Sequence, residues 1–218
     1  MPHDARVGPL LHVDRALSGA ADTTEGLARL FAEHFPAEGL VALLASPARQ
    51  ILLAAITALG VRGTPAHCPL LAALLRHENP EVVERAEDSL WRIWMQAGSP
   101  WGNGQLAKAT ELIADGRLTE ALDVLDALSF AEPTFAEAHH QRGIVLCLNE
   151  RLDAAAAAFR ETLHYNEYHF SAAVSLGHVY AQQGQTRTAL LQYRCALELH
   201  PRQANVRKLV ERFEELVA

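Results

Sequence analysis

The sequence predicts an all-α protein built as an α-α superhelix, a right-handed solenoid of stacked helix pairs. Two observations lead to this prediction. Apolar residues recur at three- and four-residue intervals between Gly and Pro breaks, which is typical of amphipathic helices. From residue 102 onward the same pattern returns every 34 residues without a gap. Because a unit of this kind cannot bury its own apolar face, each one is expected to stack on the next.

The repeating pattern can be followed through three copies. Small residues recur where two antiparallel helices must approach closely; these are Ala109, Gly143 and Gly177, and then Ala121, Ala155 and Ala189. Larger apolar residues fill the space between helix pairs; these are Leu125, Phe159 and Tyr193. Gly116 and Gly184 stand where a first helix must end, because Gly adopts the left-handed conformation without a clash. Pro133 and Pro201 end second helices, since Pro has no amide donor.

The stretch from about Trp101 to Ala218 resembles three tetratricopeptide repeats and a final capping helix. The expected repeat region is 99–202, with units at approximately 102–135, 136–169 and 170–203, and the cap is 203–218. Four residues depart from the family pattern. Ala is usual at the places of Leu128 and Thr162, Gly at the place of Glu150, and Pro at the place of Glu167. The three copies agree at most other signature places.

The expected capping helix, residues 203–218, has one apolar stripe and a polar outer side, as a terminal repeat needs for solubility. The predicted stripe consists of Val206, Leu209, Val210, Phe213, Leu216 and Val217.

Residues 23–98 have a different rhythm. The segment TEGLARLFAEHF predicts a helix that Pro36 ends. Two helix pairs are expected after it, because a set of apolar and small residues returns after 31 residues. The first set is Ile51, Ala55, Ala58 and Leu59, and the matching second set is Val82, Ala86, Ser89 and Leu90. This resembles two HEAT repeats, a family whose short consensus is mostly apolar helical periodicity. Residues 1–22 are interrupted by Gly and Pro, so they are expected to form a poorly ordered lead-in.

Composition argues against several classes of function. The chain has 218 residues and a net charge of −7 at pH 7, with no basic stripe, so no nucleic-acid partner is expected. No apolar run is long enough to span a membrane. The N-terminus lacks the features of a secretory signal, and the three cysteines form no CxxC pair. The expected location is cytoplasmic.

The chain contains no motif that indicates catalysis. It has no GxxxxGK[ST] loop and no GxSxG or HExxH motif, so neither an enzyme nor a cofactor is expected. A metal site built on His140, Cys147 and His178 is an alternative, because imidazole and thiolate bind zinc. The histidine spacing follows the repeat and contains none of the short ligand pairs. Surface or groove positions are therefore expected for the histidines.

Three tryptophans, Trp91, Trp94 and Trp101, surround the Gly98-Ser99-Pro100 break. We expect them to fill the joint between the HEAT-like pairs and the first tetratricopeptide unit, because aromatic residues dominate cores. An exposed binding hot spot is the alternative.

The tetratricopeptide resemblance also implies a binding surface. In that family, the first helix of each unit lines a groove for peptides. Carried over one by one, the peptide-binding positions are Leu106, Thr110 and Ile113 in the first unit, Glu137, His140, Ile144 and Cys147 in the second, and Ser171, Val174, His178 and Gln182 in the third.

The family's carboxylate clamp of Lys, Asn and Arg is absent; Leu106, Thr110, Ser171 and Ser175 stand at the corresponding places. The resemblance thus implies a non-catalytic protein-interaction scaffold or adaptor for a helix or an extended apolar peptide of unknown identity. Self-assembly through the groove, giving a homo-oligomer, is the alternative.

Overall fold

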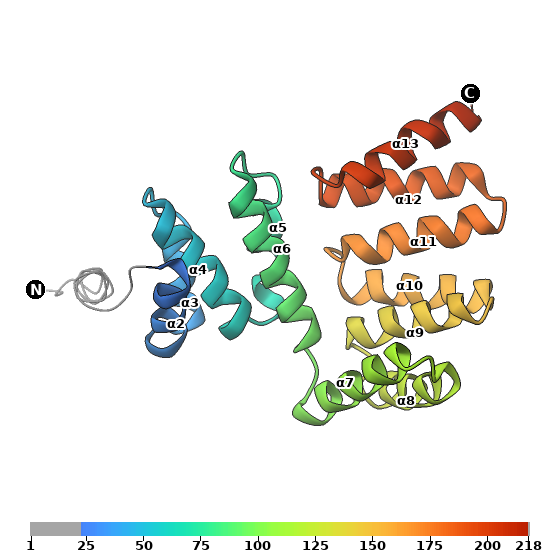
Figure 1. The fold of residues 1–218 in the computed structure, drawn as a ribbon, viewed down its shortest axis with the longest axis horizontal. Coiled ribbons are helices and arrows are strands. Elements are labelled where there is room, and N and C mark those ends of the chain that lie inside the picture. Colours follow the sequence, from blue (N-terminus) through green and yellow to red (C-terminus); the bar gives the residue numbers. More distant parts are fainter. Residues whose placement is uncertain (1–22, 218) are drawn as a thin grey trace, which may run out of the picture. The chain divides into compact units, whose positions relative to one another are not determined.

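The computed structural model describes residues 23–217, and among these it contains α-helices and one short 3-10 helix but no strand (Figure 1). The predicted all-α class is thereby confirmed. The chain divides into two compact units between Ile93 and Trp94. The predicted lead-in over residues 1–22 lies outside the described residues. No helix in the described part is long and apolar enough to cross a membrane.

The first unit begins with one helix and continues with two helix pairs. Its helices are α2 (Thr24–His34), α3 (Ala37–Leu43), α4 (Arg49–Arg62), α5 (Cys68–Leu74) and α6 (Pro80–Met95), with the 3-10 helix η1 (Pro65–His67) before α5. Thr23 caps α2 by accepting a hydrogen bond from the Gly26 amide at 3.1 Å. The predicted first helix and the two pairs after it are therefore present. The last of these helices, α6, ends at Met95, two residues past the unit boundary at Ile93.

Helices α4 and α6 pack closely because small residues meet at their crossing. The hydroxyl of Ser89 donates a hydrogen bond to the Ile56 carbonyl at 2.9 Å. A Cβ atom added at Gly60 would lie 2.8 Å from the Ser89 hydroxyl oxygen. The equivalent turns of the two pairs are alike, since Ser46 accepts from the Ala48 amide and His77, 31 residues later, accepts from the Asn79 amide. The 31-residue spacing thus places equivalent residues at equivalent turns.

The second unit contains three helix pairs and a final helix. They are α7 (Pro100–Ala114), α8 (Leu118–Ala131), α9 (Ala136–Leu148), α10 (Leu152–Tyr165), α11 (Phe170–Gln182), α12 (Thr186–Leu199) and α13 (Ala204–Val217). Consecutive helices contact one another from α7 through α13. Figure 1 shows them stacked in chain order, from yellow-green at α7 to red at α13.

The first helix of each pair ends in the same way. The residue after the C-cap has a positive φ: 74° at Gly116, 58° at Glu150 and 74° at Gly184. The next amide then donates back across the turn, from Arg117 to Leu112, from Arg151 to Leu146 and from Gln185 to Tyr180. Glu150 adopts this conformation although a side chain makes it less favourable than at Gly. The repeat thus determines the turn even where the sequence departs from its pattern.

Close packing within each pair explains the small residues of the repeat. Ala155 and Ala189 are fully buried, as predicted. A Cβ atom at Gly143 would lie 2.6 Å from the Phe159 ring, and one at Gly177 would lie 2.5 Å from the Tyr193 ring. The aromatic residue of the second helix therefore rests directly on the backbone of the first.

Helix α13 covers the end of the stack, as the capping prediction requires. Val206, Val210 and Phe213 are buried, and the Phe213 ring packs edge-on against Tyr193 with centroids 5.2 Å apart. Leu216, which was expected in the apolar stripe, is 63% exposed. The buried stripe is narrower than predicted because Leu216 lines an open pocket between α11, α12 and α13.

Candidate functional site

The predicted groove residues all lie on the first helices α7, α9 and α11, but their exposure differs strongly. Leu106, Glu137 and His140 are buried. Six others are partly buried; they are Thr110, Ile113, Ile144, Cys147, Ser171 and Val174. His178 and Gln182 are exposed. Within the predicted surface, His178 and Gln182 are therefore the residues most accessible to a ligand.

The end of α6 accounts for much of this burial. The Trp94 indole stacks on the His169 ring with centroids 4.3 Å apart and planes at 17°, and it also packs against Phe170. Met95 packs against the apolar cluster that contains Leu106. Trp94 is buried as part of the second unit, whereas Trp101 is 51% exposed. Trp94 and Met95 therefore contribute to the packing of the second unit.

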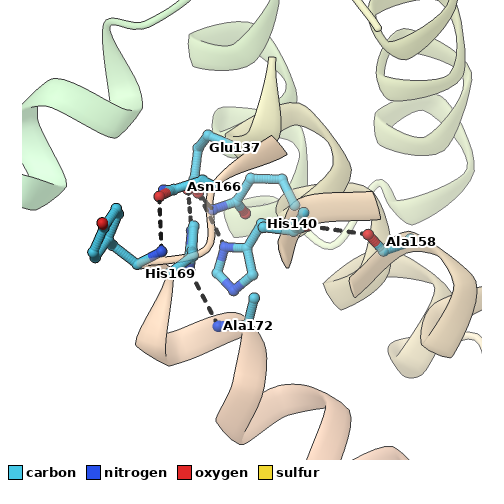
Figure 2. Close-up of polar contacts among 9 residues, drawn as sticks. Glu137, His140, Ala158, Asn166, His169 and Ala172 are labelled. Carbon is cyan, nitrogen blue, oxygen red and sulfur yellow. Dashed lines mark hydrogen bonds and ion pairs between the residues drawn. The ribbon is translucent and has the colours of Figure 1, made fainter. Parts of the chain in front are cut away.

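A buried polar cluster surrounds Glu137 (Figure 2). The Glu137 carboxylate on α9 accepts hydrogen bonds from His140 Nδ1 at 3.1 Å, from Gln141 Nε2 at 2.7 Å and from His169 Nε2 at 2.9 Å. His169 caps α11, because its Nδ1 accepts from the Ala172 amide at 3.1 Å. Glu137 thus connects the second tetratricopeptide unit to the start of the third.

Burial and hydrogen bonding shift the pKa values of Glu137 and His169 in this cluster. Burial opposes ionisation of Glu137, but the hydrogen bonds from His140 and His169 outweigh it and hold the pKa of this carboxyl well below its usual range. Burial, together with the neighbouring His140, lowers the pKa of His169 to about 4 despite the bond to Glu137. An anionic carboxylate and a neutral His169 imidazole therefore share the interior.

Glu137, His140 and His169 also form a group that resembles a metal site, with candidate ligand atoms within 4.8 Å of one another. The hydrogen bonding of His169 opposes this use. Its Nδ1 accepts from a backbone amide, so Nε2 carries the proton and donates to Glu137. A metal on Nε2 would need the proton on Nδ1, directly facing the Ala172 amide donor. The arrangement is suited to holding protons between the carboxylate and the two rings.

Sequence reasoning missed this cluster. It expected surface or groove histidines, whereas His139, His140, His169 and His200 are buried. His169 lies 32 residues after Glu137, a separation that matches no short ligand motif. The alternative metal set of His140, Cys147 and His178 is not the group that the described residues bring together. The available signal was the repeat itself, since residues nearly one period apart lie on neighbouring units.

The accessible part of the groove ends in a pocket of about 470 Å³ between α11, α12 and α13. His178 and Gln182 line it from α11, and Arg212 and Leu216 line it from α13. The Tyr193 hydroxyl and His178 Nδ1 share a hydrogen bond of 2.9 Å. Burial lowers the pKa of His178 and raises the pKa of Tyr193. The pocket combines apolar walls with hydrogen-bonding groups and one permanent positive charge, a mixture that suits a peptide side chain.

Comparison with known proteins identifies the fold. No protein-family model matches the chain, and no curated protein matches it. One similar solved structure is the first tetratricopeptide domain of Spaghetti (RPAP3) bound to an HSP90 peptide, with 16% identity and a TM-score of 0.51 over 53% of this chain and 92% of that one. Another is the MamA protein, with 17% identity and a TM-score of 0.51 over 68% of this chain and 81% of that one.

At such identities the likeness is one of fold alone. The chain has a tetratricopeptide-type helical fold, in agreement with the three units that the sequence predicts. The HEAT-like interpretation of residues 23–98 has no counterpart in these comparisons and stays a prediction.

Proposed function

We propose that this chain is a non-catalytic protein-interaction scaffold whose second unit binds a peptide or a helix in the groove formed by α7, α9 and α11. The pocket between α11, α12 and α13 is the single observation that carries the proposal, because it places His178 and Gln182 beside apolar walls at the accessible end of the groove. The half-buried Ile144, Ser171 and Val174 extend this surface toward α9.

A structure of the same fold supports the proposal, since the Spaghetti (RPAP3) domain is bound to a peptide. The ligand here differs in chemistry from an acidic C-terminal tail, because Leu106 is buried and Ser171 and Ser175 supply no positive charge at the clamp positions. Arg212 is the one permanent positive charge among the residues that line the pocket. An apolar peptide segment with a single acidic or polar group matches this surface best. A HEAT-like first unit and a cytoplasmic location belong to the same proposal.

Self-assembly is a second candidate, and exposed apolar residues favour it. Phe130 on α8 is 90% exposed and Leu216 on α13 is 63% exposed. Exposed apolar groups of this size are common at interfaces. Light scattering over a range of concentrations separates the two candidates, since a monomeric adaptor keeps one mass and a self-assembling chain does not.

Site-specific photo-crosslinking in extract of the source cells tests the scaffold proposal. A photoreactive amino acid at Gln182 is exposed in the pocket, and the same amino acid at Arg160, exposed on α10, is the control. The proposal predicts a crosslinked partner of defined mass from position 182 and not from position 160. Crosslinking of the same partner from position 160 alone would place the binding surface elsewhere.

A further inference from the structure

The first unit contains a cleft that is separate from the groove just described. It has a volume of about 550 Å³ and is lined by α2, α4 and α6. Its floor is small and apolar: Ala28, Ala32 and Val61 contribute no polar side-chain group, and the Thr57 hydroxyl already donates to the Leu53 carbonyl at 3.0 Å. Val61 is 51% exposed although it is aliphatic. A ligand with an aliphatic side chain would remove this surface from water.

Four arginines line the same cleft, namely Arg29 on α2, Arg62 on α4, and Arg85 and Arg92 on α6. Arg85 is engaged, because it forms an ion pair of 2.5 Å with Glu25. Among residues 23–217, the other three form no ion pair. Three guanidinium groups are therefore available to a ligand around one apolar floor.

The local charge has the opposite sign to that of the whole chain. Four arginines and two carboxylates, Glu25 and Glu33, line the cleft, which gives 4 − 2 = +2, whereas the chain carries −7. Glu81 and Asp88, which also help raise the pKa of Arg85, do not line the cleft, and Glu81 is paired with Arg49. Positive charge concentrated in a cleft of an acidic protein attracts an acidic ligand and orients its approach.

The lining also discriminates between classes of anionic ligand. It includes no aromatic side chain, so it offers no surface on which a nucleic-acid base could stack. The guanidinium fork binds carboxylates in a planar, two-point geometry, and the apolar floor gives an aliphatic side chain a place to bind. A peptide that presents both groups satisfies the whole cleft.

We propose that the cleft between α2, α4 and α6 is a second binding site, which takes an acidic peptide segment with a leucine-like side chain flanked by carboxylates. The aliphatic side chain rests against Val61 and the neighbouring alanines, and the carboxylates pair with Arg29, Arg62 and Arg92. The scaffold then has two surfaces of different chemistry, one in each unit, and this site does not depend on the groove proposed above.

Fluorescence anisotropy with the full chain tests the proposal. The probe is a fluorescein-labelled synthetic dodecapeptide in which two leucines are each flanked by glutamates, and its partner probe has glutamine at every glutamate. The test variant combines Arg29→Gln, Arg62→Gln and Arg92→Gln. Its matched control combines Lys108→Gln, Arg160→Gln and Arg187→Gln, which removes the same number of positive charges from exposed positions in the second unit.

The proposal predicts that wild type and the control bind the glutamate peptide equally, and that the test variant binds it about tenfold more weakly, as expected for several exposed charge pairs lost together. The glutamine peptide should lose a similar factor with wild type, and Val61→Ser should also weaken binding. All the altered side chains are exposed, so circular dichroism should show unchanged folding.

Several outcomes would overturn the proposal. These are equal affinity of test and control variants, no binding to wild type, or undiminished binding to Val61→Ser. A labelled single-stranded oligonucleotide that binds more tightly than the peptide would replace the peptide ligand with a nucleic acid. Full displacement of the peptide by equimolar inorganic phosphate would show a simple anion site in place of a peptide site.

Discussion

Position 137 holds a carboxylate that is 1% exposed and accepts three hydrogen bonds from side chains of two neighbouring units. The sequence predicted the helix on which Glu137 lies, and the family resemblance placed the residue in a groove. Its burial could not be predicted, because its partner His169 is covered by the indole of Trp94, which comes from a helix that lies outside the repeat. Pattern reasoning of this kind locates a side chain on its own helix but not the neighbours that cover it.

Replacing Glu137 by Gln should strongly destabilise the second unit. The amide offers one acceptor oxygen and turns an NH2 group toward imidazole and amide donors, which leaves buried donors without a partner. Removing one member of such a buried polar group costs about 3 kcal/mol or more. Urea unfolding measures this loss. Glu161→Gln, at an exposed position on α10, should change the free energy of unfolding by less than about 0.5 kcal/mol. Equal stability of the two variants would show that the cluster contributes nothing.

The same cluster should make stability depend on pH. The pKa of His169 is about 4 in the folded chain and about 6.5 ordinarily, so between these values the unfolded chain binds more protons. Stability is therefore fully present above pH 6.5 and is lost as the pH falls toward 4. Glu137, whose pKa is also lowered, adds to the loss at still lower pH. Urea unfolding at pH 7 and pH 5 should show a lower free energy of unfolding at pH 5.

His169→Asn is the informative control for this pH dependence, because Asn can still cap α11 by accepting from the Ala172 amide. The variant should be less stable than wild type at pH 7 but should lose less stability on going to pH 5. The same loss in both proteins would assign the pH dependence to other groups.

Individual helices and their turns are where the sequence was most informative. The 34-residue period predicted Gly143 and Gly177 as places where two helices approach closely, and the structure has that approach. The sequence placed Phe159 and Tyr193 between helix pairs, whereas their rings rest on these glycines within a pair. The first-helix turns could be located from Gly116 and Gly184, and Glu150 takes the same conformation without a glycine. The last turn of α13 was predicted less well, because periodicity alone gave no sign that Leu216 lines an open pocket and stays 63% exposed.

A pair of glycine substitutions separates packing from helix propensity. Gly177→Ala would place a Cβ atom 2.5 Å from the Tyr193 ring, and that ring is held by its hydroxyl bond to His178. Overpacking of this kind costs about 1–3 kcal/mol. Gly104→Ala, in α7 with no atom within 4 Å, should instead stabilise by about 0.5–1 kcal/mol. Thermal unfolding of both variants checks the opposite signs, and a stabilised Gly177→Ala would contradict the close approach.

Two substitutions on α13 test its capping role. Phe213 is buried against Tyr193, so Phe213→Ala should cost about 3 kcal/mol, whereas Leu216→Ala at an exposed position should cost less than about 1 kcal/mol. Denaturant unfolding followed by circular dichroism measures both. A Phe213→Ala variant as stable as Leu216→Ala would mean that α13 does not stabilise the stack.

At the scale of the whole molecule, the sequence predicted a chain of helix pairs with a change of rhythm before residue 99, and the structure has two compact units that divide between Ile93 and Trp94. The difference arises because Trp94 and Met95 continue α6 but pack against residues of the second unit. A sequence pattern predicts where a helix ends. The boundary of a compact unit depends instead on which apolar core the side chains of the last helical turn pack against. The pocket proposed for the partner lies between α11, α12 and α13.

We propose that a partner binds in the pocket between α11, α12 and α13. The dissociation constant of an identified partner tests this proposal most directly. One variant carries His178→Glu and Gln182→Glu in the pocket, and its control carries Ala127→Glu and Ala157→Glu at exposed positions on α8 and α10, adding the same charge. With folding verified by thermal unfolding, we expect the pocket variant to bind at least about tenfold more weakly, equivalent to about 1.4 kcal/mol, and the control to bind like wild type. Equal dissociation constants for the two variants would contradict the claim.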